Sequence, residues 1–439
     1  MTTRLTQIGP LQRRGIRAGI YSICSSGAVV LETAMAHAAC HSIDMVVEST
    51  CNQVNQYGGY ANMTPADFAA YVRGLSVQAG LPDDRLLIGG DHLGPYPWRH
   101  EKAQIAMGKA EKLVSDCISA GYGKIHLDCG MPLGDDPADS NFIPPELSAD
   151  RTVRLCRAAE AARTGRQRKQ GLPLYVIGAE APTPGGSLKG PIAVPVTEPS
   201  EIAAFMDICR QKFEAAGIDD AWQRIAAVVV QPGIDFGPDS CMPYNPDRAR
   251  ALSQFHDSLP GIMTYEVHST DFQGRKALST LVDDHFALLK TGPVLTFAFR
   301  EAVFALAHIE NELLKGEKTA DPSEIIGVIE GEMAASGEYW RSHVPEDIAD
   351  PRIYMIYGLT DRIRYFWNTP PVRTAFEKLI SNLDRPIPLG LTSQYLPEAF
   401  EDIMNGRLSA KPLPLIRHRI LKALAPYVTA CHGKDSFGP

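Results

Sequence analysis

The sequence predicts a closed α/β barrel of eight parallel strands, a (β/α)8 or TIM barrel, followed by a helical C-terminal extension. Short apolar runs alternate with longer helical patterns between about residue 15 and residue 315. The runs are apolar almost throughout, as expected for parallel strands that are covered by helices. No glycine-rich dinucleotide loop or Walker loop follows the first run, which counts against an open doubly wound sheet.

The eight predicted strands can be placed in order along the chain. They are 15–25, 45–49, 85–92, 124–128, 174–180, 225–231, 262–268 and 286–290. Helical patterns between them include 27–36, 101–120 and 294–314, and Thr64 and Pro65 fit the N-cap and first turn of another helix. Eight such units in roughly 300 residues match a barrel better than an open sheet.

The pattern changes beyond about residue 321. Helices are predicted at 324–334, 371–383 and 414–428, joined by proline-rich connections. We therefore expect a barrel over residues 1–320, and a helical extension over 321–439 that packs on the barrel or on a partner.

Composition excludes several classes of protein. Of 439 residues, 44% are hydrophobic and 21% charged, which is ordinary for a soluble globular protein. The net charge of -8 argues against a nucleic-acid or membrane-surface protein. Nine scattered cysteines form neither a disulfide framework nor a paired zinc module, so reduced thiols in the cytoplasm are expected. We find no signal peptide and no apolar run long enough to span a membrane.

Polar residues recur where the predicted strands end, which is where barrels of this type build active sites. They are Glu48, Asp91, His92, Asp128, Glu180, Gln231, Glu266, His268 and Lys290. Buried carboxylates are costly unless they are paired or bind a cation. Mixed imidazole and carboxylate ligands suit Zn²⁺, or alternatively Mn²⁺. The competing interpretation is a salt-bridge network with Lys124 and Lys290.

Two loops at the same end of the barrel suit a phosphate group. Ser269, Thr270 and Asp271 follow the seventh strand, and Gly292 follows the eighth and opens a helix whose N-terminus favours anions. Ordinary turn and N-cap chemistry is the alternative.

Gln231 and Lys290, at the ends of the sixth and eighth strands, are also expected to contact the substrate or its phosphate. Two other segments are candidates for contact with a ligand. Asn52 and Gln53 could hydrogen-bond sugar hydroxyls, or satisfy the backbone of a long loop. The segment 360–367 could send an arginine to the ligand, although a helix with one charged face is the favoured interpretation.

Several of these segments resemble one family closely. The segments are 52–60, 63–68, 89–95, 124–128, 230–233, 268–271 and 361–365. They are similar to the Z-type subunit of class II D-tagatose-1,6-bisphosphate aldolase, from about residue 15 to the C-terminus. The resemblance implies a TIM barrel that serves galactitol, tagatose or amino-sugar catabolism, without catalysis of its own. It also implies a separate Y-type catalytic subunit as partner. Some family members are labelled tagatose-6-phosphate kinase.

The wider class II aldolase pattern assigns roles to individual residues. It implies that Asp91 transfers a proton and that His92 and His268 bind zinc. We expect Asp128, at the end of the fourth strand, to be a second catalytic acid. Glu180 looks like the glutamate on strand five, and we expect it to be a further metal ligand. Gln231 stands where the pattern has a further zinc-binding histidine, and it is a poor zinc ligand.

Three hypotheses follow from these assignments. The first is a non-catalytic subunit that supports a Y-type aldolase. The second is a stand-alone, metal-dependent aldolase or ketose epimerase acting on a sugar or sugar phosphate. Either protein could form a homo-oligomer. A kinase ranks last, because neither a Walker loop nor a kinase-type glycine loop is present.

Overall fold

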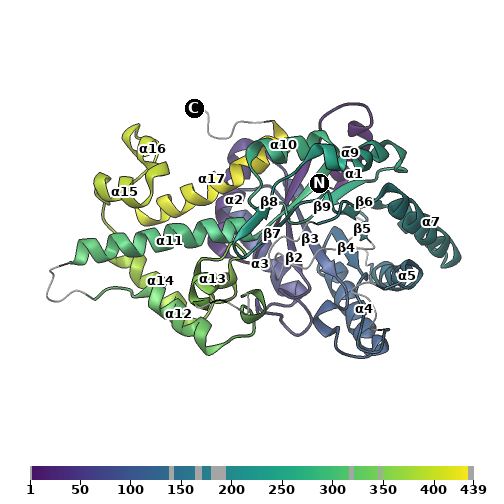
Figure 1. Ribbon diagram of the computed structural model, residues 1–439, viewed down its shortest axis with the longest axis horizontal. Helices are drawn as coiled ribbons and strands as arrows, with labels where there is room; N and C mark the ends of the chain where they lie inside the picture. The colour runs from purple at the N-terminus through teal and green to yellow at the C-terminus, as the bar shows by residue number, and fades with distance from the viewer. Residues whose placement is uncertain are drawn as a thin grey trace.

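Eight parallel strands close into a barrel in the computed structural model, in the order β1-β10-β9-β6-β5-β4-β3-β2 (Figure 1). The structure describes residues 2–137, 143–163, 171–178, 194–315, 321–344, 348 and 350–433. The barrel strands are β1 (Ile20–Cys24), β2 (Met45–Thr50), β3 (Leu86–Leu93), β4 (Lys124–Asp128), β5 (Leu174–Gly178), β6 (Ile225–Val230), β9 (Thr264–Val267) and β10 (Phe286–Thr291). The predicted (β/α)8 fold with C-terminal helices is confirmed.

The strands form because their side chains are apolar on both faces. Every residue of β6 is buried, as is every residue of β10. Helices cover the outer face of the sheet, as parallel strands require. They are α2 (Ala28–His41), α3 (Pro65–Ala79), α4 (Ala103–Ser119), α5 (Pro145–Ala161), α7 (Pro199–Ala215), α8 (Asp219–Trp222), α9 (Pro246–Phe255), α10 (Arg275–Asp283) and α11 (Pro293–Leu314).

The cap predicted at the start of α3 is confirmed. The Thr64 hydroxyl accepts a hydrogen bond from the backbone N–H of Asp67, and the Asp67 carboxylate accepts one from the backbone N–H of Thr64. This reciprocal arrangement fixes the point at which the helix begins.

Two elements were absent from the sequence-based prediction. The N-terminal helix α1 (Thr2–Gln12) places Leu5 and Ile8 in a cluster with apolar strand residues, which closes the N-terminal end of the barrel. A short hairpin of β7 (Asp235–Gly237) and β8 (Ser240–Met242) follows β6.

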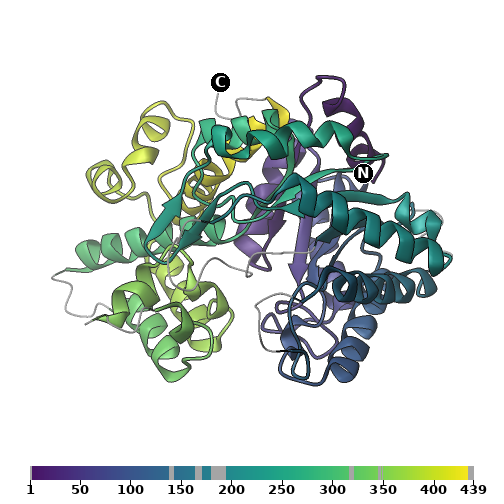
Figure 2. The same ribbon diagram turned by 45° about the vertical axis from the view of Figure 1, so that its right-hand side comes forward.

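Further helices follow the barrel and gather beside it (Figure 2). They are α12 (Ile325–Ala335), α13 (Pro351–Tyr357), α14 (Pro370–Asn382), α15 (Leu389–Tyr395), α16 (Phe400–Met404) and α17 (Pro412–His432). The predicted helices at 324–334, 371–383 and 414–428 therefore exist, with shifted ends. The last helix, α17, packs against α2, α10, α11 and β1, so the C-terminus returns to cover the barrel. The division at residue 320 stays a prediction.

No helix in the described segments is long and apolar enough to cross a bilayer.

Candidate active site at the barrel mouth

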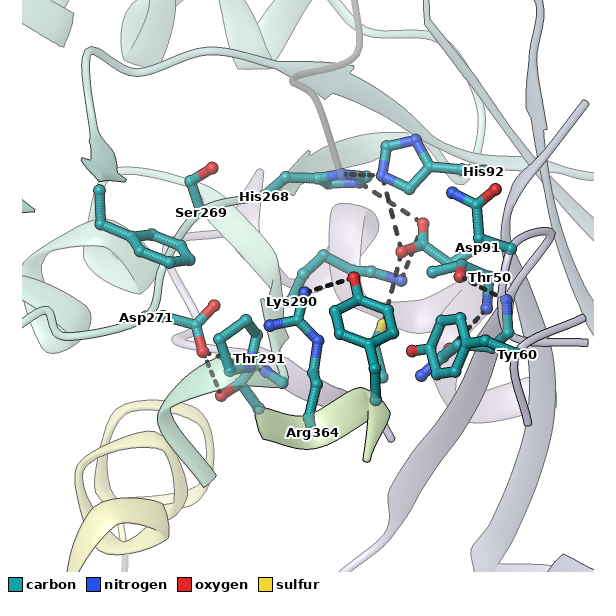
Figure 3. Close-up of a pocket in the computed structure, with 17 residues that line it drawn as sticks. Thr50, Tyr60, Asp91, His92, His268, Ser269, Asp271, Lys290, Thr291 and Arg364 are labelled. Carbon is teal, nitrogen blue, oxygen red and sulfur yellow. Dashed lines mark hydrogen bonds and ion pairs between the residues drawn. The ribbon is translucent and has the colours of Figure 1, made fainter. Parts of the chain in front are cut away.

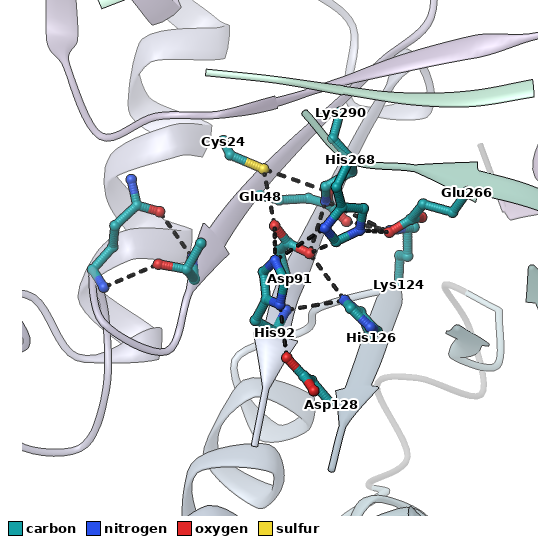
Figure 4. A network of polar contacts seen from close by, with 12 residues as sticks. Cys24, Glu48, Asp91, His92, Lys124, His126, Asp128, Glu266, His268 and Lys290 are labelled. Atoms are coloured by element: carbon teal, nitrogen blue, oxygen red, sulfur yellow. Dashed lines mark hydrogen bonds and ion pairs between the residues drawn. The ribbon is translucent and has the colours of Figure 1, made fainter. Parts of the chain in front are cut away.

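A bulge in β3 brings two neighbouring residues to the barrel mouth. Between the pairs Gly90–Ile125 and Leu93–Leu127, two residues of β3 lie opposite a single residue of β4, His126. Those two residues are Asp91 and His92, and His92 has a left-handed φ of 48°. Adjacent side chains of a regular strand point to opposite faces, whereas a bulge can re-aim one of them. Both side chains therefore join one network (Figure 4).

A chain of hydrogen bonds links two histidines to two carboxylates. His92 Nδ1 lies 2.7 Å from Asp128 Oδ2, and His92 Nε2 lies 3.0 Å from His268 Nδ1. His268 Nε2 in turn lies 3.1 Å from Glu266 Oε1. Burial opposes the positive charge on His92, but the Asp91 and Asp128 carboxylates outweigh it and raise the His92 pKa to about 9. With His92 protonated, each link has one donor and one acceptor.

His126 lies beside this chain on β4. Its Nδ1 atom is 3.0 Å from Asp91 Oδ1 and 3.1 Å from the backbone nitrogen of His92. Its Nε2 atom is buried and has no hydrogen-bond partner among the described residues. An unpartnered buried nitrogen is costly, which makes this atom available to a ligand.

Two lysines balance the buried acids beneath the histidines. Lys124 Nζ lies 2.6 Å from Glu48 Oε1 and 2.6 Å from Glu266 Oε2. Burial opposes the charge on Glu266, but Lys124 and His268 lower its pKa to about 2. Lys290 contacts Glu48 and lies 3.1 Å from Asp91 Oδ1. The salt-bridge network considered from the sequence therefore exists, alongside the histidines.

Four residues of this network could also hold a metal ion. Asp91, His126, Glu266 and His268 are buried, and each offers one ligand atom within 4.8 Å of the others. Two imidazoles and two carboxylates form a donor set of the kind that binds a divalent ion. In the tautomer with its proton on Nδ1, facing the Asp91 carboxylate, His126 carries its lone pair on the buried, unpartnered Nε2, and this supports the fit. The structure thus contains a buried cluster that could bind a metal, built partly from residues other than those predicted.

A pocket opens onto the network (Figure 3). Residues from five strand ends and from the C-terminal region line it. They are Cys24, Thr50, Asn52, Gln53, Tyr60, Asp91, His92, Phe236, His268, Ser269, Asp271, Lys290, Thr291, Gly292, Pro293, Arg364 and Tyr365.

Most of the predicted substrate residues line this pocket, and two do not. Asn52, Gln53, Ser269, Asp271, Lys290 and Gly292 all contribute to the lining. Thr270 instead donates a hydrogen bond to the backbone carbonyl of Lys290. The Gln231 side-chain oxygen accepts hydrogen bonds from the backbone of Gly233 and Ile234, at 2.8 and 2.9 Å. These two side chains support the loops of the mouth.

Asp271 occupies the helix N-terminus that was expected to attract a phosphate. Its Oδ1 atom accepts hydrogen bonds from the backbone N–H groups of Gly292, at 3.1 Å, and Val294, at 2.9 Å. A carboxylate of the chain itself thus caps α11. The phosphate role of these residues stays a prediction.

The structure brings together two of the three predicted metal ligands and both predicted catalytic acids. His92 and His268 are brought together, and Asp91 and Asp128 lie in the same network. Glu180 lies outside the described residues.

Sequence reasoning placed Glu266 at the barrel mouth but missed His126 as a ligand beside it. Lys124, His126 and Asp128 alternate along β4, a spacing that places all three side chains on one face. That alternation is the sequence signal that could have identified His126 as a site residue.

The segment 360–367 also differs from the favoured interpretation as a helix with a charged face. A short 3-10 turn, Arg362–Tyr365, places Arg364 and Tyr365 in the pocket lining. The alternative that an arginine reaches the pocket fits this arrangement.

The chain is similar to known proteins over nearly its whole length. Residues 5–432 match the family model described as D-tagatose-1,6-bisphosphate aldolase subunit GatZ/KbaZ-like. The chain is 41% identical to the D-tagatose-1,6-bisphosphate aldolase subunit GatZ of Klebsiella pneumoniae subsp. pneumoniae, over 97% of this chain and 98% of the relative. Identity to the subunit of the same name from Salmonella dublin is 41%, over 95% of this chain and 97% of the relative.

A solved structure is similar over nearly the same length. It is a crystal structure from Sinorhizobium meliloti 1021 described as a probable tagatose 6 phosphate kinase. Its TM-score is 0.85 at 36% sequence identity, and the match covers 94% of this chain and 100% of that chain. The chain belongs to the D-tagatose-1,6-bisphosphate aldolase subunit GatZ/KbaZ-like family.

Proposed function

We propose that this chain is the Z-type subunit of a D-tagatose-1,6-bisphosphate aldolase and supports the stability and activity of a separate, Y-type catalytic subunit. The observation that carries the proposal is 41% identity, over nearly the full length of both chains, to relatives named as this subunit. Gln231 adds support, because its side chain is engaged by the Gly233–Ile234 turn and is a poor zinc ligand. Catabolism of galactitol or tagatose in the cytoplasm is part of the proposal.

An aldolase assay tests this role directly. A Y-type class II catalytic subunit is assayed for cleavage of tagatose 1,6-bisphosphate, alone and with an equimolar amount of this chain. We expect this chain to have no activity alone, to raise the activity of the catalytic subunit and to lengthen its half-life on warming. Albumin at the same concentration controls for nonspecific stabilisation. An unchanged rate and half-life would refute the proposal.

The cluster at the barrel mouth favours a second candidate function, a metal-dependent aldolase or ketose epimerase acting on a sugar phosphate. The supporting observation is that His92, His126 and His268 meet Asp91 and Glu266 beneath an open pocket. A purely structural subunit has no need for buried imidazoles at this position. Asp91, His126, Glu266 and His268 would hold Zn²⁺ or Mn²⁺, with His92 as a further ligand once it is deprotonated. When bound, such an ion supplies a Lewis acid that polarises a carbonyl group.

The residues of the chain have separate tasks in this second candidate. Asp91 lines the pocket and is placed to accept a proton from a substrate hydroxyl. Asp128 orients His92 through its 2.7 Å contact with Nδ1. Asn52, Gln53, Ser269 and Arg364 line the pocket above and are placed to hold hydroxyl and phosphate groups.

Activity of the isolated chain separates the two candidates. Wild type and His92→Ala are incubated with Zn²⁺ or Mn²⁺ and a panel of ketose phosphates, and products are resolved by NMR. Turnover by wild type that is lost in His92→Ala would establish the second candidate. Absence of turnover by the isolated chain, together with activation of the Y-type subunit, would support the first candidate, the non-catalytic subunit.

A further inference from the structure

We propose that His256, Asp257 and His285 form a second site for a divalent transition-metal ion, of the Zn²⁺ type, at the N-terminal end of the barrel. This end lies opposite the mouth. His256 and Asp257 belong to a 3-10 turn, His256–Ser258, that follows α9, and His285 directly precedes β10. In Figure 1 the region lies near the labels of α1 and α9. The inference does not depend on the proposed function.

The three side chains already lie within reach of one ion. Each offers one ligand atom, and these atoms lie within 4.8 Å of one another. His256 Nδ1 is 3.7 Å from Asp257 Oδ1. Two ligands bonded to zinc in tetrahedral geometry lie about 3.4 Å apart, given bonds of about 2.0–2.2 Å. The His256–Asp257 pair is therefore close to the spacing that a bound ion requires.

A hydrogen-bond chain leaves the His256 Nδ1 lone pair without a partner. The Gln12 side-chain nitrogen donates to the carbonyls of Ala18 and Val282, so its oxygen is an acceptor and receives the Thr264 hydroxyl proton at 2.9 Å. The Thr264 oxygen then accepts from His256 Nε2, at 3.3 Å. In this tautomer Nδ1 carries the lone pair, as in metal-binding histidines whose other nitrogen is held by a second residue.

The unpartnered nitrogen is also fully buried. His256 is 0% exposed, and its Nδ1 atom has no hydrogen-bond partner in the part of the chain that is described. It faces a carboxylate oxygen, so two acceptors oppose each other across 3.7 Å, which is too long for a hydrogen bond. A divalent cation would satisfy both acceptors.

Access and charge around the site also suit an ion. The Asp257 side chain is 71% exposed and His285 is partly exposed, so an ion can enter from solvent. Burial lowers the pKa of His285, and the neighbouring Asp257, Asp284 and Asp283 carboxylates act in the opposite direction. The rings of His256 and His285 are stacked, with centroids 4.4 Å apart. Since a nitrogen lone pair lies in its ring plane, His285 must turn about its side-chain torsions to complete the site.

The test uses variants that preserve the backbone. His285 has a left-handed φ of 74°, and asparagine tolerates that region well, so His285→Asn removes a ligand without adding strain. Asp257→Asn keeps the size of an exposed side chain. His308→Asn, at an exposed position on α11, is the matched control. All are made in a His268→Ala background, which removes a histidine of the mouth cluster.

Metal-stripped protein is then titrated with Zn²⁺, and bound ions are counted by mass spectrometry after gel filtration. Co²⁺ absorption reports the ligand set. We expect one ion at this site in the background protein and in the His308→Asn control. His285→Asn and Asp257→Asn should each weaken binding at least 10-fold and lose the Co²⁺ absorption bands. Equal stoichiometry and affinity in all variants, or no ion in the background protein, would overturn the proposal.

Discussion

Removing the charge of Lys124 should destabilise the barrel strongly. Its ammonium group lies 2.6 Å from both Glu48 Oε1 and Glu266 Oε2, and its side chain is 2% exposed while both partners are 0% exposed. In Lys124→Met, Glu48 keeps its contact with Lys290, but Glu266 loses its nearest cation. Breaking a buried ion pair by removing one partner costs about 3–5 kcal/mol, and we expect a loss in that range.

Urea unfolding followed by circular dichroism and fluorescence measures the change. The control is Lys112→Met, which removes a lysine that is 63% exposed and paired with Asp116 on one helix face. Such an exposed pair contributes about 0.3–0.5 kcal/mol. A loss below about 1 kcal/mol in Lys124→Met would contradict the role of Lys124 as the balancing charge.

The pH dependence of the same variant provides a second check. The pKa of Glu266 is lowered to about 2 in the folded chain from an ordinary value of 4.5, with Lys124 the first cause opposing burial. A lowered carboxyl pKa stabilises the fold above 4.5, and the stabilisation is lost as the pH falls through 2. Glu266 titrates alike in the two unfolded chains, so the difference in stability between wild type and Lys124→Met changes only where Glu266 is protonated in one folded protein and not in the other. The difference should be largest near neutral pH and should shrink as the pH falls towards 2. A deficit that grew on acidification would refute the reasoning.

Three further substitutions test other parts of the site. His92→Gln should melt at a lower temperature than wild type at pH 6, and the difference should narrow by pH 10. The reason is that the His92 pKa is raised from 6.5 to about 9 in the folded chain, so its stabilising contribution is complete below pH 6.5 and is lost as the pH rises through 9. A difference in melting temperature that does not vary with pH would exclude this. Asp271→Ala should lower the free energy of unfolding in urea by about 1–2 kcal/mol because it removes the cap of α11, and Asp271→Asn should lower it by less because the amide oxygen can still cap the helix. Equal losses in the two variants would argue against capping. Gly94→Ala would place its Cβ 1.8 Å from the Asp128 carbonyl oxygen. We expect the free energy of unfolding to fall by at least about 1–3 kcal/mol and the His92 imidazole resonance to shift in the NMR spectrum. An unchanged spectrum would refute the tight contact.

The barrel could be predicted because its strands are apolar on both faces and its polar residues fall at the strand ends. Glu48, Asp128 and Lys290 were placed at the mouth for this reason, and they lie there. The participation of Asp91 and His92 together depends on a bulge opposite His126, which strand alternation alone does not predict.

Other parts of the site depend on contacts between distant segments. Arg364 reaches the pocket from a turn that follows the barrel, although its local pattern resembles a charged helix face. Asp271 caps α11 because the loop after β9 folds onto Gly292 and Val294. Since a capping carboxylate and a phosphate-binding loop share the same sequence signals, only the structure separates them.

Imidazoles and carboxylates from separate strands are proposed to form one divalent-metal site beneath the pocket at the barrel mouth. Zn²⁺ bound per chain, counted by mass spectrometry in a His285→Asn background with and without His268→Ala, tests this claim most directly. We predict one bound ion in the His285→Asn protein and none once His268 is also replaced. An equal ion count in both proteins, or no bound ion in either, would contradict the claim.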